Sequence, residues 1–423
     1  MIAAPASGQG KTTVTAALAR LHHRQGRRVT MFKCGPDFLD PQIHAIASGA
    51  PCENLDFRMG GEADVAWRLA RAARNSDLIL IEGVMGLFDG EPSAADLARR
   101  YGLPILAVID GRAMARSFGA IALGLKLYEP DTPLIGALAN NVGSPHHGNL
   151  LRDSLPPGLD WFGAFPRDGA VALPERHLGL LPASEIADLS DKLDRLADAI
   201  ADTAASQLPP TAHFADVPPP SLAQHLAGRT IAVARDGAFC FLYPANLDCL
   251  EGMGAKLSFF SPLEDQALPK CDAIWLPGGY PELHGARLTA NGAMRAALAG
   301  HVAAGKPLLA ECGGMMALAE TLVDQAGQSW PMMGLLPGIV RMQPKLAALG
   351  MQVLDWQEAR LTGHCFHYSR FETPMIPVAQ TQGLRQRPGE AIYQDRALVA
   401  SYFHAYFPSA PEAVARLFSG DFF

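Results

Sequence analysis

Two short stretches of this 423-residue chain carry residues whose types and spacing can do chemistry. In the C-terminal half, AECGGMMAL (310–318) places Cys312 between an apolar run and two glycines. A nucleophile on a sharp strand-to-helix turn is exposed, and a helix N-terminus lowers a thiol pKa. The pattern therefore favours a catalytic thiol over a buried core cysteine.

A thiol nucleophile needs a base from elsewhere in the chain. The candidates are His364 and His367 in GHCFHYS, and His404 in SYFHAYF. His404 follows the apolar run 397–403, which predicts a buried strand. We therefore prefer His404 as the base, with a structural histidine at a strand edge as the alternative.

The same reasoning predicts an oxyanion hole. The sequence LPGGYPE (276–282) ends another predicted strand in a glycine pair, and a helix over 315–322 is predicted to follow Cys312. Backbone N–H groups at such turns can stabilise an oxyanion. Gly279 and Gly313 are the candidate donors, and a plain turn is the alternative.

The second stretch, PASGQGKT (5–12), fits the phosphate-loop pattern G-x-x-x-x-G-K-[ST], except that Pro5 occupies the first glycine position. In this pattern the lysine reaches the β- and γ-phosphates and the threonine hydroxyl binds Mg²⁺. A helix predicted over 12–25 follows the loop. A glycine-rich turn that binds nothing is the alternative. The predicted ATP-binding residues of the loop are Gly8, Gln9, Gly10, Lys11, Thr12 and Thr13.

Acidic side chains follow the predicted strands beside this loop. Mg–ATP chemistry needs anionic oxygens beyond the loop itself, and Glu82 ends a strand at the carboxyl edge of the sheet. We therefore predict a magnesium site of Thr12, Glu82 and Asp37, although each acid taken alone can be a solvated turn. Lys33 can neutralise a phosphate or a substrate carboxylate, and Asn141 can contact the adenine edge. Two further acids on these loops are Asp40 and Asp89.

Continuous apolar, β-rich runs alternate with helical patterns in the first half, which is typical of strands buried on both faces of a parallel sheet. The predicted strands are 29–33, 77–83, 104–110, 134–141 and 161–165, and the predicted helices include 12–25 and 63–74. The pattern predicts a doubly wound α/β domain over 1–205.

Five prolines in 206–228 indicate a linker, after which the α/β pattern restarts. The second half has predicted strands at 229–236, 256–262, 271–279 and 306–314, and predicted helices at 246–255 and 294–305. We therefore predict a second, independent α/β domain over 229–423.

Composition excludes several classes of function. The net charge of −7 and pI near 6.0 argue against a duplex-binding surface, which needs clustered lysine and arginine. No apolar run is long enough to span a bilayer, and no signal peptide is recognisable. The seven cysteines are scattered and form no C-x-x-C pair, which favours the reducing cytoplasm over a disulfide framework or a zinc site.

Seven motifs together resemble one family, in an order that covers nearly the whole chain: APASGQGKTT, KCGPDFLDP, IEGVMGLFDG, LPGGYPELH, AECGGMMAL, GHCFHYS and SYFHAYF. The chain is similar to the cobyrinate a,c-diamide synthases, the glutamine- and ATP-dependent amidases of corrin biosynthesis. The resemblance implies an amidoligase domain over 1–205 that binds ATP and substrate, with a P-loop fold similar to dethiobiotin synthetase. It implies a class I glutamine amidotransferase-like α/β domain over 229–423.

By this resemblance Cys312 is the glutaminase nucleophile, and His404 raises its nucleophilicity. Many class I amidotransferases carry an acid two residues after this histidine, where Tyr406 stands here, so a dyad replaces the triad. The resemblance places Lys11 and Thr12 in the ATP site, with Glu82 at Mg²⁺. The predicted substrate residues are Lys33, Asp37, Asp40 and Asp89.

The implied reaction joins two chemistries. ATP converts a corrin carboxylate to an acyl phosphate, and Cys312 releases ammonia from L-glutamine through a thioester. The same chemistry on hydrogenobyrinate or nickel-sirohydrochlorin stays open, as does homodimer formation. An alternative of another class is a regulatory P-loop ATPase with an inactive amidotransferase domain.

Overall fold

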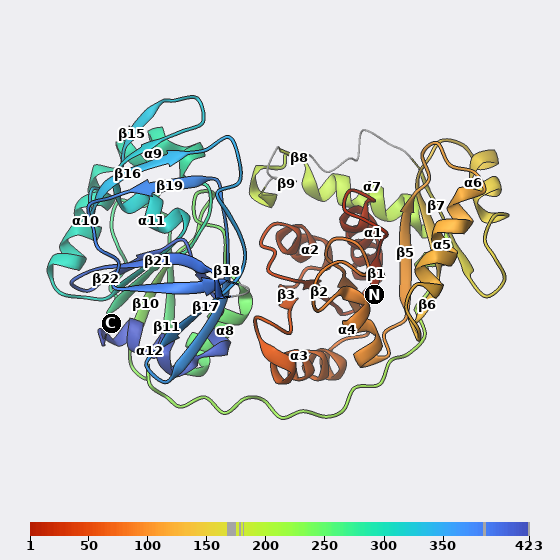
Figure 1. Cartoon of the computed structure of the whole chain (residues 1–423), viewed down its shortest axis with the longest axis horizontal. Coiled ribbons are helices and arrows are strands. Elements are labelled where there is room, and N and C mark those ends of the chain that lie inside the picture. The colour runs from red at the N-terminus through yellow and green to blue at the C-terminus, as the bar shows by residue number, and fades with distance from the viewer. Residues whose placement is uncertain (167–174, 177–178, 181, 384–385, 422–423) are drawn as a thin grey trace. The chain divides into compact units, whose positions relative to one another are not determined.

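The computed structural model describes residues 1–166, 175–176, 179–180, 182–383 and 386–421, and it contains two compact units (Figure 1). The first unit comprises residues 1–57 and 62–219, and the second comprises residues 58–61 and 220–423. The separation after residue 219 falls inside the proline-rich segment 206–228. No helix or strand lies between Ser206 and Thr230.

A seven-stranded parallel sheet organises the first unit, in the order β3-β2-β4-β1-β5-β6-β7. β1 has only two residues, yet it lies at the centre of the sheet between β4 and β5. The strand order reverses beside β1, where open α/β sheets bind ligands. The strands are β1 (Ile2–Ala3), β2 (Val29–Cys34), β3 (Cys52–Leu55), β4 (Leu78–Glu82), β5 (Ile105–Asp110), β6 (Leu134–Val142) and β7 (Asp160–Pro166).

Helices cover both faces of this sheet. Alternate residues of β5 point into different cores: Val108 packs with α1, α2 and α7, whereas Ile109 packs with α3, α4 and α5. This two-sided burial explains the continuous apolar strands and confirms the predicted doubly wound fold. The helices are α1 (Lys11–Arg24), α2 (Asp40–Ser48), α3 (Gly61–Asn75), α4 (Ala94–Tyr101), α5 (Ser117–Leu127), α6 (Pro145–Arg152) and α7 (Leu189–Ala201).

The second unit is built on a ten-stranded mixed sheet, in the order β11-β10-β12-β13-β22-β21-β20-β17-β18-β23. The first five strands are parallel, and the rest pair antiparallel. The strands are β10 (Thr230–Ala234), β11 (Lys256–Phe260), β12 (Ala273–Leu276), β13 (Leu308–Glu311), β17 (Ala348–Trp356), β18 (Ala359–His367), β20 (Ala379–Gly383), β21 (Pro388–Asp395), β22 (Leu398–Ser401) and β23 (His404–Ala405).

Helices pack on both faces of the parallel half of this sheet, with α9, α10 and α11 in one core and α8 and α12 in the other. They are α8 (Pro244–Gly252), α9 (Gly285–Ala290), α10 (Gly292–Ala303), α11 (Gly313–Leu318) and α12 (Pro411–Ser419). The second α/β fold is therefore confirmed. No helix among the described residues is both long and apolar enough to cross a bilayer.

One predicted element is wrong. The helix expected over 315–322 ends at Leu318, and residues Ala319–Val323 form β14 instead. β14 pairs with β15 (Ser329–Pro331) on one side and with β16 (Leu336–Met342) on the other. β19 (Ser369–Glu372) pairs with β16 and completes a separate four-stranded sheet in the order β15-β14-β16-β19. Long-range strand pairing of this kind overrides a local helical pattern.

Candidate active sites

The loop before α1 has the geometry of a phosphate cradle. Gly10 caps the helix with a left-handed backbone, φ 91°, which L-residues with side chains rarely adopt. Lys11 is buried, and its Nζ donates to the carbonyl oxygens of Met85 at 2.6 Å and Ala6 at 3.1 Å. Burial is the main cause that lowers the pKa of Lys11, and the charge of Lys33 adds to it. The lysine is thus held over the loop on which phosphates would bind.

Asn140 holds this loop, which the sequence did not reveal. Its Nδ2 donates to the Gln9 carbonyl at 2.9 Å, and the Gln9 side chain accepts from the Asp110 backbone N–H at 2.8 Å. Asn141, the predicted adenine contact, donates to the Asp110 carboxylate at 3.0 Å. Asn140 at the end of β6 therefore supports the loop directly, whereas Asn141 bonds to Asp110, whose backbone N–H contacts the loop.

We expect Gly10→Ala to destabilise the first unit and to weaken nucleotide binding. A Cβ at this position would overlap Asn140 Nδ2, and the left-handed φ adds strain. The expected loss is about 2–4 kcal/mol in the free energy of unfolding. Gly26→Ala is the matched control, since its φ of 81° is similar but the space around it is open, and about 1–2 kcal/mol is expected. Equal losses in urea titrations of the two variants would contradict the steric argument.

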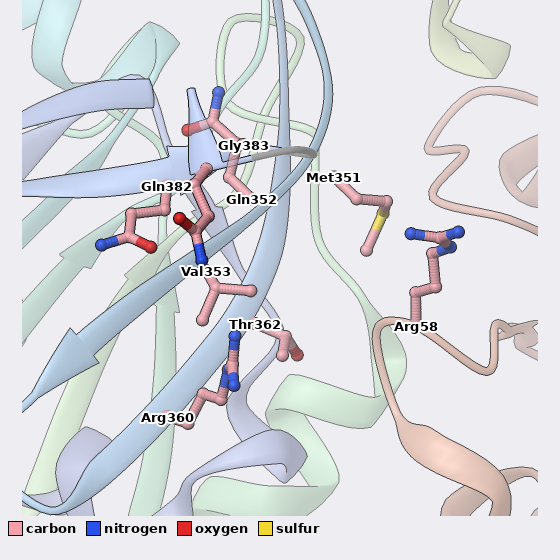
Figure 2. Close-up of a pocket in the computed structure, with 9 residues that line it drawn as sticks. Arg58, Met351, Gln352, Val353, Arg360, Thr362, Gln382 and Gly383 are labelled. Carbon is pink, nitrogen blue, oxygen red and sulfur yellow. The ribbon is translucent and has the colours of Figure 1, made fainter. Parts of the chain in front are cut away.

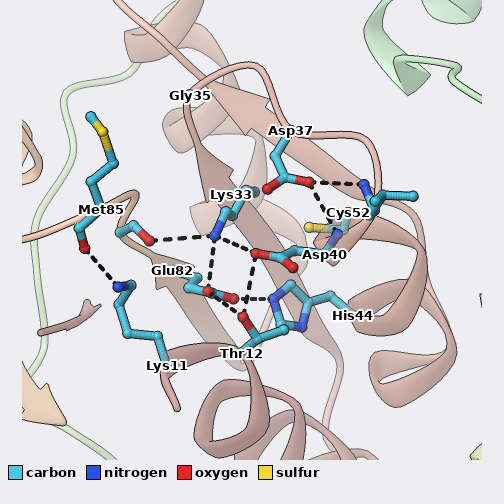
Figure 3. Close-up of polar contacts among 12 residues, drawn as sticks. Lys11, Thr12, Lys33, Gly35, Asp37, Asp40, His44, Cys52, Glu82 and Met85 are labelled. Atoms are coloured by element: carbon cyan, nitrogen blue, oxygen red, sulfur yellow. Dashed lines mark hydrogen bonds and ion pairs between the residues drawn. The ribbon is translucent and has the colours of Figure 1, made fainter. Parts of the chain in front are cut away.

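Five side chains meet at the carboxyl ends of β2 and β4 and the start of α1 (Figure 3). Glu82 is fully buried, and its Oε1 lies 2.9 Å from both Lys33 Nζ and Thr12 Oγ1. Its Oε2 contacts His44 Nε2. Lys33 Nζ also pairs with Asp40 Oδ2 at 2.5 Å, and Thr12 Oγ1 lies 3.3 Å from the same oxygen.

The charged side chains of this cluster shift one another's pKa values. Burial alone would raise the pKa of Glu82, but Lys33 and His44 outweigh it and hold that pKa well below its ordinary value. Conversely, the acids hold the pKa of Lys33 well above its usual range despite burial. Burial, followed by the charges of Asp37 and Glu82, raises the pKa of Asp40 to about 7. Two carboxylates, those of Glu82 and Asp40, thus face Lys33 and His44 in this cluster.

The donor set fits magnesium in its chemistry. Thr12, Glu82 and Asp40 bring one hydroxyl and two carboxylates together, and Mg²⁺ prefers oxygen ligands. Within the described ranges, no group of three or more histidine, cysteine, aspartate or glutamate residues could hold a metal ion by itself. Magnesium commonly relies on one or two carboxylates together with substrate phosphates and water.

The other predicted acids have local partners. Asp37 Oδ1 accepts from the backbone N–H groups of Leu39 and Asp40, at 2.8 and 3.1 Å, and so organises the start of α2. Asp89 Oδ2 accepts from Gly86 N–H at 2.9 Å, on the loop whose Met85 carbonyl binds Lys11. Asp40, rather than Asp37, is the acid that reaches the Thr12 hydroxyl.

Cys312 sits on the sharp turn that the sequence predicts. The residue joins β13 to α11 with φ 45° and ψ −104°, a strained conformation for a side-chain-bearing residue. Its N–H donates to the Ser401 carbonyl at 2.7 Å, which ties the turn to the end of β22. Burial raises the pKa of the Cys312 thiol well above its ordinary value, whereas the Gly313 N–H acts in the opposite direction.

His404 and the turn at Cys312 both pack against the short segment formed by Gly278 and Gly279. A Cβ at Gly278 would collide with His404 Cε1, so the histidine ring lies against this glycine. A Cβ at Gly313 would lie 2.7 Å from the Gly279 nitrogen, so these two glycines are in direct contact. Residues 278 and 279 thus touch the candidate base on one side and the nucleophile's turn on the other.

The histidines have distinct surroundings. His404 is buried and stacks on His364, with ring centroids 5.1 Å apart, and burial lowers the pKa of His404 well below its usual range. His364 Nδ1 lies 3.0 Å from the Tyr243 hydroxyl, and burial lowers its pKa to about 3. His367 pairs with Glu390 at 3.1 Å. His404 is therefore neutral, and the same burial opposes its protonation.

Glu311 was not predicted, although an acid that ends an apolar strand beside Cys312 is a usable signal. It is buried, and its carboxylate accepts from Trp275 Nε1 at 3.0 Å and from Ala405 N–H at 2.9 Å. Ala405 follows His404, so Glu311 holds the backbone of the candidate base. Burial raises the pKa of Glu311 to about 8.

This pKa predicts a pH dependence of stability. From about pH 4.5, the ordinary value, to about 8, the folded state holds a proton on Glu311 that the unfolded chain has lost. The free energy of unfolding therefore falls as pH rises through this window, by up to about 1.4 kcal/mol per pH unit. Glu311→Gln should remove that slope. The free energy of unfolding of both proteins is measured at several pH values. If it changes with pH by the same amount in both proteins across this window, the prediction is contradicted.

A separate pocket lies in the second unit (Figure 2). Neither Cys312 nor His404 lines it. Its lining residues are Arg58, Met351, Gln352, Val353, Arg360, Thr362, Gln382, Gly383 and Gln386.

Both units match known domain families. Residues 1–181 match the CobQ/CobB/MinD/ParA nucleotide binding domain, and residues 230–412 match the CobB/CobQ-like glutamine amidotransferase domain. The fold and the matches define a glutamine amidotransferase that also carries a nucleotide-binding domain.

Full-length relatives narrow this class. The chain is 57% identical over 418 residues to the hydrogenobyrinate a,c-diamide synthase of Stutzerimonas stutzeri, covering 99% of this chain and 97% of the relative. The chain is also 57% identical to the hydrogenobyrinate a,c-diamide synthase of Pseudomonas aeruginosa, over 99% of this chain and 96% of the relative. Identity to the cobyrinate a,c-diamide synthase of Herminiimonas arsenicoxydans is 50%, covering 100% and 96%. The chain belongs to the a,c-diamide synthase family of cobalamin biosynthesis.

Proposed function

We propose that this chain uses ATP and glutamine to convert the a and c carboxylates of a cobyrinate-type corrin into amides. The observation that carries the proposal is the arrangement at Cys312. A strained turn bears the thiol, and the segment of Gly278 and Gly279 contacts both His404 and Gly313. This arrangement supports a glutaminase, and the phosphate loop supports activation of an acid by ATP.

In the glutaminase half, His404 takes the proton of the Cys312 thiol as sulfur attacks the amide carbon of glutamine. The N–H groups of Gly279 and Gly313 stabilise the oxyanion of the tetrahedral intermediate. The intermediate collapses to a thioester as His404 returns the proton to the leaving nitrogen, which departs as ammonia. Water then hydrolyses the thioester to glutamate and restores the thiol.

In the ATP half, a corrin carboxylate oxygen attacks the γ-phosphate, and an acyl phosphate and ADP result. Lys11 and the N–H groups of the loop stabilise the transferred charge. Thr12, Glu82 and Asp40 would hold Mg²⁺, which neutralises phosphate charge when bound. Ammonia then attacks the acyl carbon, phosphate leaves, and the amide is formed. Lys33, Asp37 and Asp89 are the further proposed substrate residues.

The relatives are named for different macrocyclic substrates. Two relatives at 57% identity are hydrogenobyrinate enzymes, and one at 50% is a cobyrinate enzyme. The higher identities make the metal-free macrocycle the first substrate to test. None of the seven cysteines, which all lie in the described part of the chain, forms a disulfide. This supports our proposal of a cytoplasmic location, while homodimer formation stays open.

Mass spectrometry tests this function. The protein is incubated with ATP, Mg²⁺ and glutamine, and separately with hydrogenobyrinate, cobyrinate and nickel-sirohydrochlorin. We expect a diamide from one of the first two, absent when ATP or glutamine is left out. ATP hydrolysis without any amide, and without glutamate release, would instead favour a regulatory ATPase with an inactive amidotransferase domain.

A further inference from the structure

His44 is a buried histidine to which the proposed reaction gives no role. It lies on α2, is fully buried, and its Nε2 contacts Glu82 Oε2 (Figure 3). An ionised carboxylate only accepts hydrogen bonds, so Nε2 carries the proton and donates it to Glu82. Among the described residues, the other ring nitrogen, Nδ1, has no hydrogen-bond partner. Within that part of the chain, the ring therefore hydrogen-bonds to Glu82 alone.

The two carboxylate oxygens of Glu82 have different partners. Oε1 lies 2.9 Å from both Thr12 Oγ1 and Lys33 Nζ, whereas Oε2 contacts His44. Oε1 thus meets Thr12, a second proposed magnesium ligand, which in turn lies 3.3 Å from the third, Asp40. The terminal torsion of a glutamate side chain is broad and roughly two-fold, so contacts to both oxygens are needed to fix it. The donor on Oε2 therefore fixes which oxygen faces the other ligands.

The sequence of α2 places His44 for this contact. Asp40 is the first residue of α2, and His44 follows it by four positions, so both lie on one face of the helix. The Asp37 carboxylate accepts from the backbone N–H of Asp40 at 3.1 Å and anchors the start of the helix. One helix face therefore brings a proposed metal ligand and the histidine to the same buried cluster (Figure 3).

Hydrogen bonds from outer side chains orient metal-binding carboxylates in proteins. We propose that His44 is a positioning residue for magnesium, an inference that rests on the magnesium site of the proposed function. By donating to Oε2 it holds the Glu82 carboxylate so that Oε1 stays beside Thr12 and available to the metal. His44 does not itself bind the metal. Without this donor, Oε2 is buried and unsatisfied unless the carboxylate turns away from the other ligands.

Calorimetric titration with ADP tests this role, because ADP binds the phosphate loop and is not consumed. The apparent Kd of Mg²⁺ follows from the ADP affinities measured at several Mg²⁺ concentrations and in EDTA. Two variants are compared, His44→Gln and His44→Asn. Glutamine has an amide nitrogen as many bonds from Cα as histidine Nε2, whereas the asparagine side chain is one bond shorter and does not reach Oε2.

For His44→Asn we expect the apparent Kd of Mg²⁺ to rise roughly 10- to 100-fold, as for loss of an outer-shell partner. Its ADP affinity in EDTA should change less than about threefold, since the loop itself is intact. His44→Gln should keep the apparent Kd of Mg²⁺ within about threefold of wild type, because the donor to Oε2 is retained.

His22→Asn is the matched control. His22 is a buried histidine of α1 in the same unit, and its Nδ1 lies 2.7 Å from an Arg27 nitrogen. This variant should leave the apparent Kd of Mg²⁺ unchanged.

A purely structural role of His44 predicts another result. If His44→Gln and His44→Asn weaken Mg²⁺ equally, or lose ADP affinity in EDTA by the same factor as in Mg²⁺, the proposal is overturned. A wild-type ADP affinity that does not depend on Mg²⁺ would instead refute the magnesium site of the proposed function itself.

Should His44→Asn fold poorly, the wild-type protein still decides. The Nε2–H proton of a buried, hydrogen-bonded imidazole gives a downfield NMR signal, which is assigned to His44 by its loss in His44→Gln. We expect this signal in the protein loaded with Mg²⁺ and ADP. Its disappearance on loading would show that His44 releases Glu82 when the metal binds, and the proposal would be wrong.

Discussion

Replacing Cys312 with serine is expected to reduce glutamine-dependent amidation by roughly 10³-fold or more, because a serine at this turn has no comparably ionisable group. Activity with added ammonium salts should stay within about twofold of wild type, since the ATP half does not use the thiol. The measurement is the initial rate of amide formation with each nitrogen source.

Cys249→Ser is the matched control for this experiment. Cys249 is a buried thiol of α8 in the same unit, and we assign it no role in the reaction. It should keep both activities. A folded Cys312→Ser protein that also loses the ammonia-dependent reaction would refute the division of labour between the two sites.

Lys11→Ala is expected to lower both the glutamine- and the ammonia-dependent rates by roughly 10²–10³-fold, because both routes need the same activated carboxylate. The buried Lys11 Nζ lies over the loop, held by the carbonyls of Met85 and Ala6, where it can bind phosphate oxygens. Glutaminase activity measured without ATP should be retained in this variant.

Lys192→Ala provides the control for Lys11→Ala. Lys192 lies in α7 of the same unit, and its Nζ also donates to a backbone carbonyl, that of Ala187. It should leave both nitrogen routes unchanged. Undiminished amide formation by Lys11→Ala would remove the phosphate loop from the mechanism.

The sequence predicted those features that local pattern encodes. Each strand of the first sheet that we predicted is present, because burial on both faces leaves a continuous apolar run. The turn at Cys312 was predictable because a buried strand ends there in a glycine pair. The helix after it was wrong beyond Leu318, because β14 is stabilised by strands that lie further along the chain.

Residues that act through distant partners were missed. Asn140 supports Gln9 across 131 positions, which no local pattern encodes. His44 contacts Glu82 and is fully buried; its place four residues after Asp40, on the same face of α2, is a signal that could have found it. The roles of these residues follow from long-range contacts, which only the folded chain brings together.

The central claim is that nitrogen freed at Cys312 is the nitrogen installed on the corrin carboxylates. It is tested most directly with glutamine labelled with ¹⁵N in its amide group, supplied with ATP, Mg²⁺, the accepted macrocycle and an equal concentration of unlabelled ammonium. Our account predicts a diamide in which both new nitrogens are predominantly ¹⁵N for the wild type, and unlabelled product for Cys312→Ser. A wild-type diamide that carries mainly unlabelled nitrogen would contradict it.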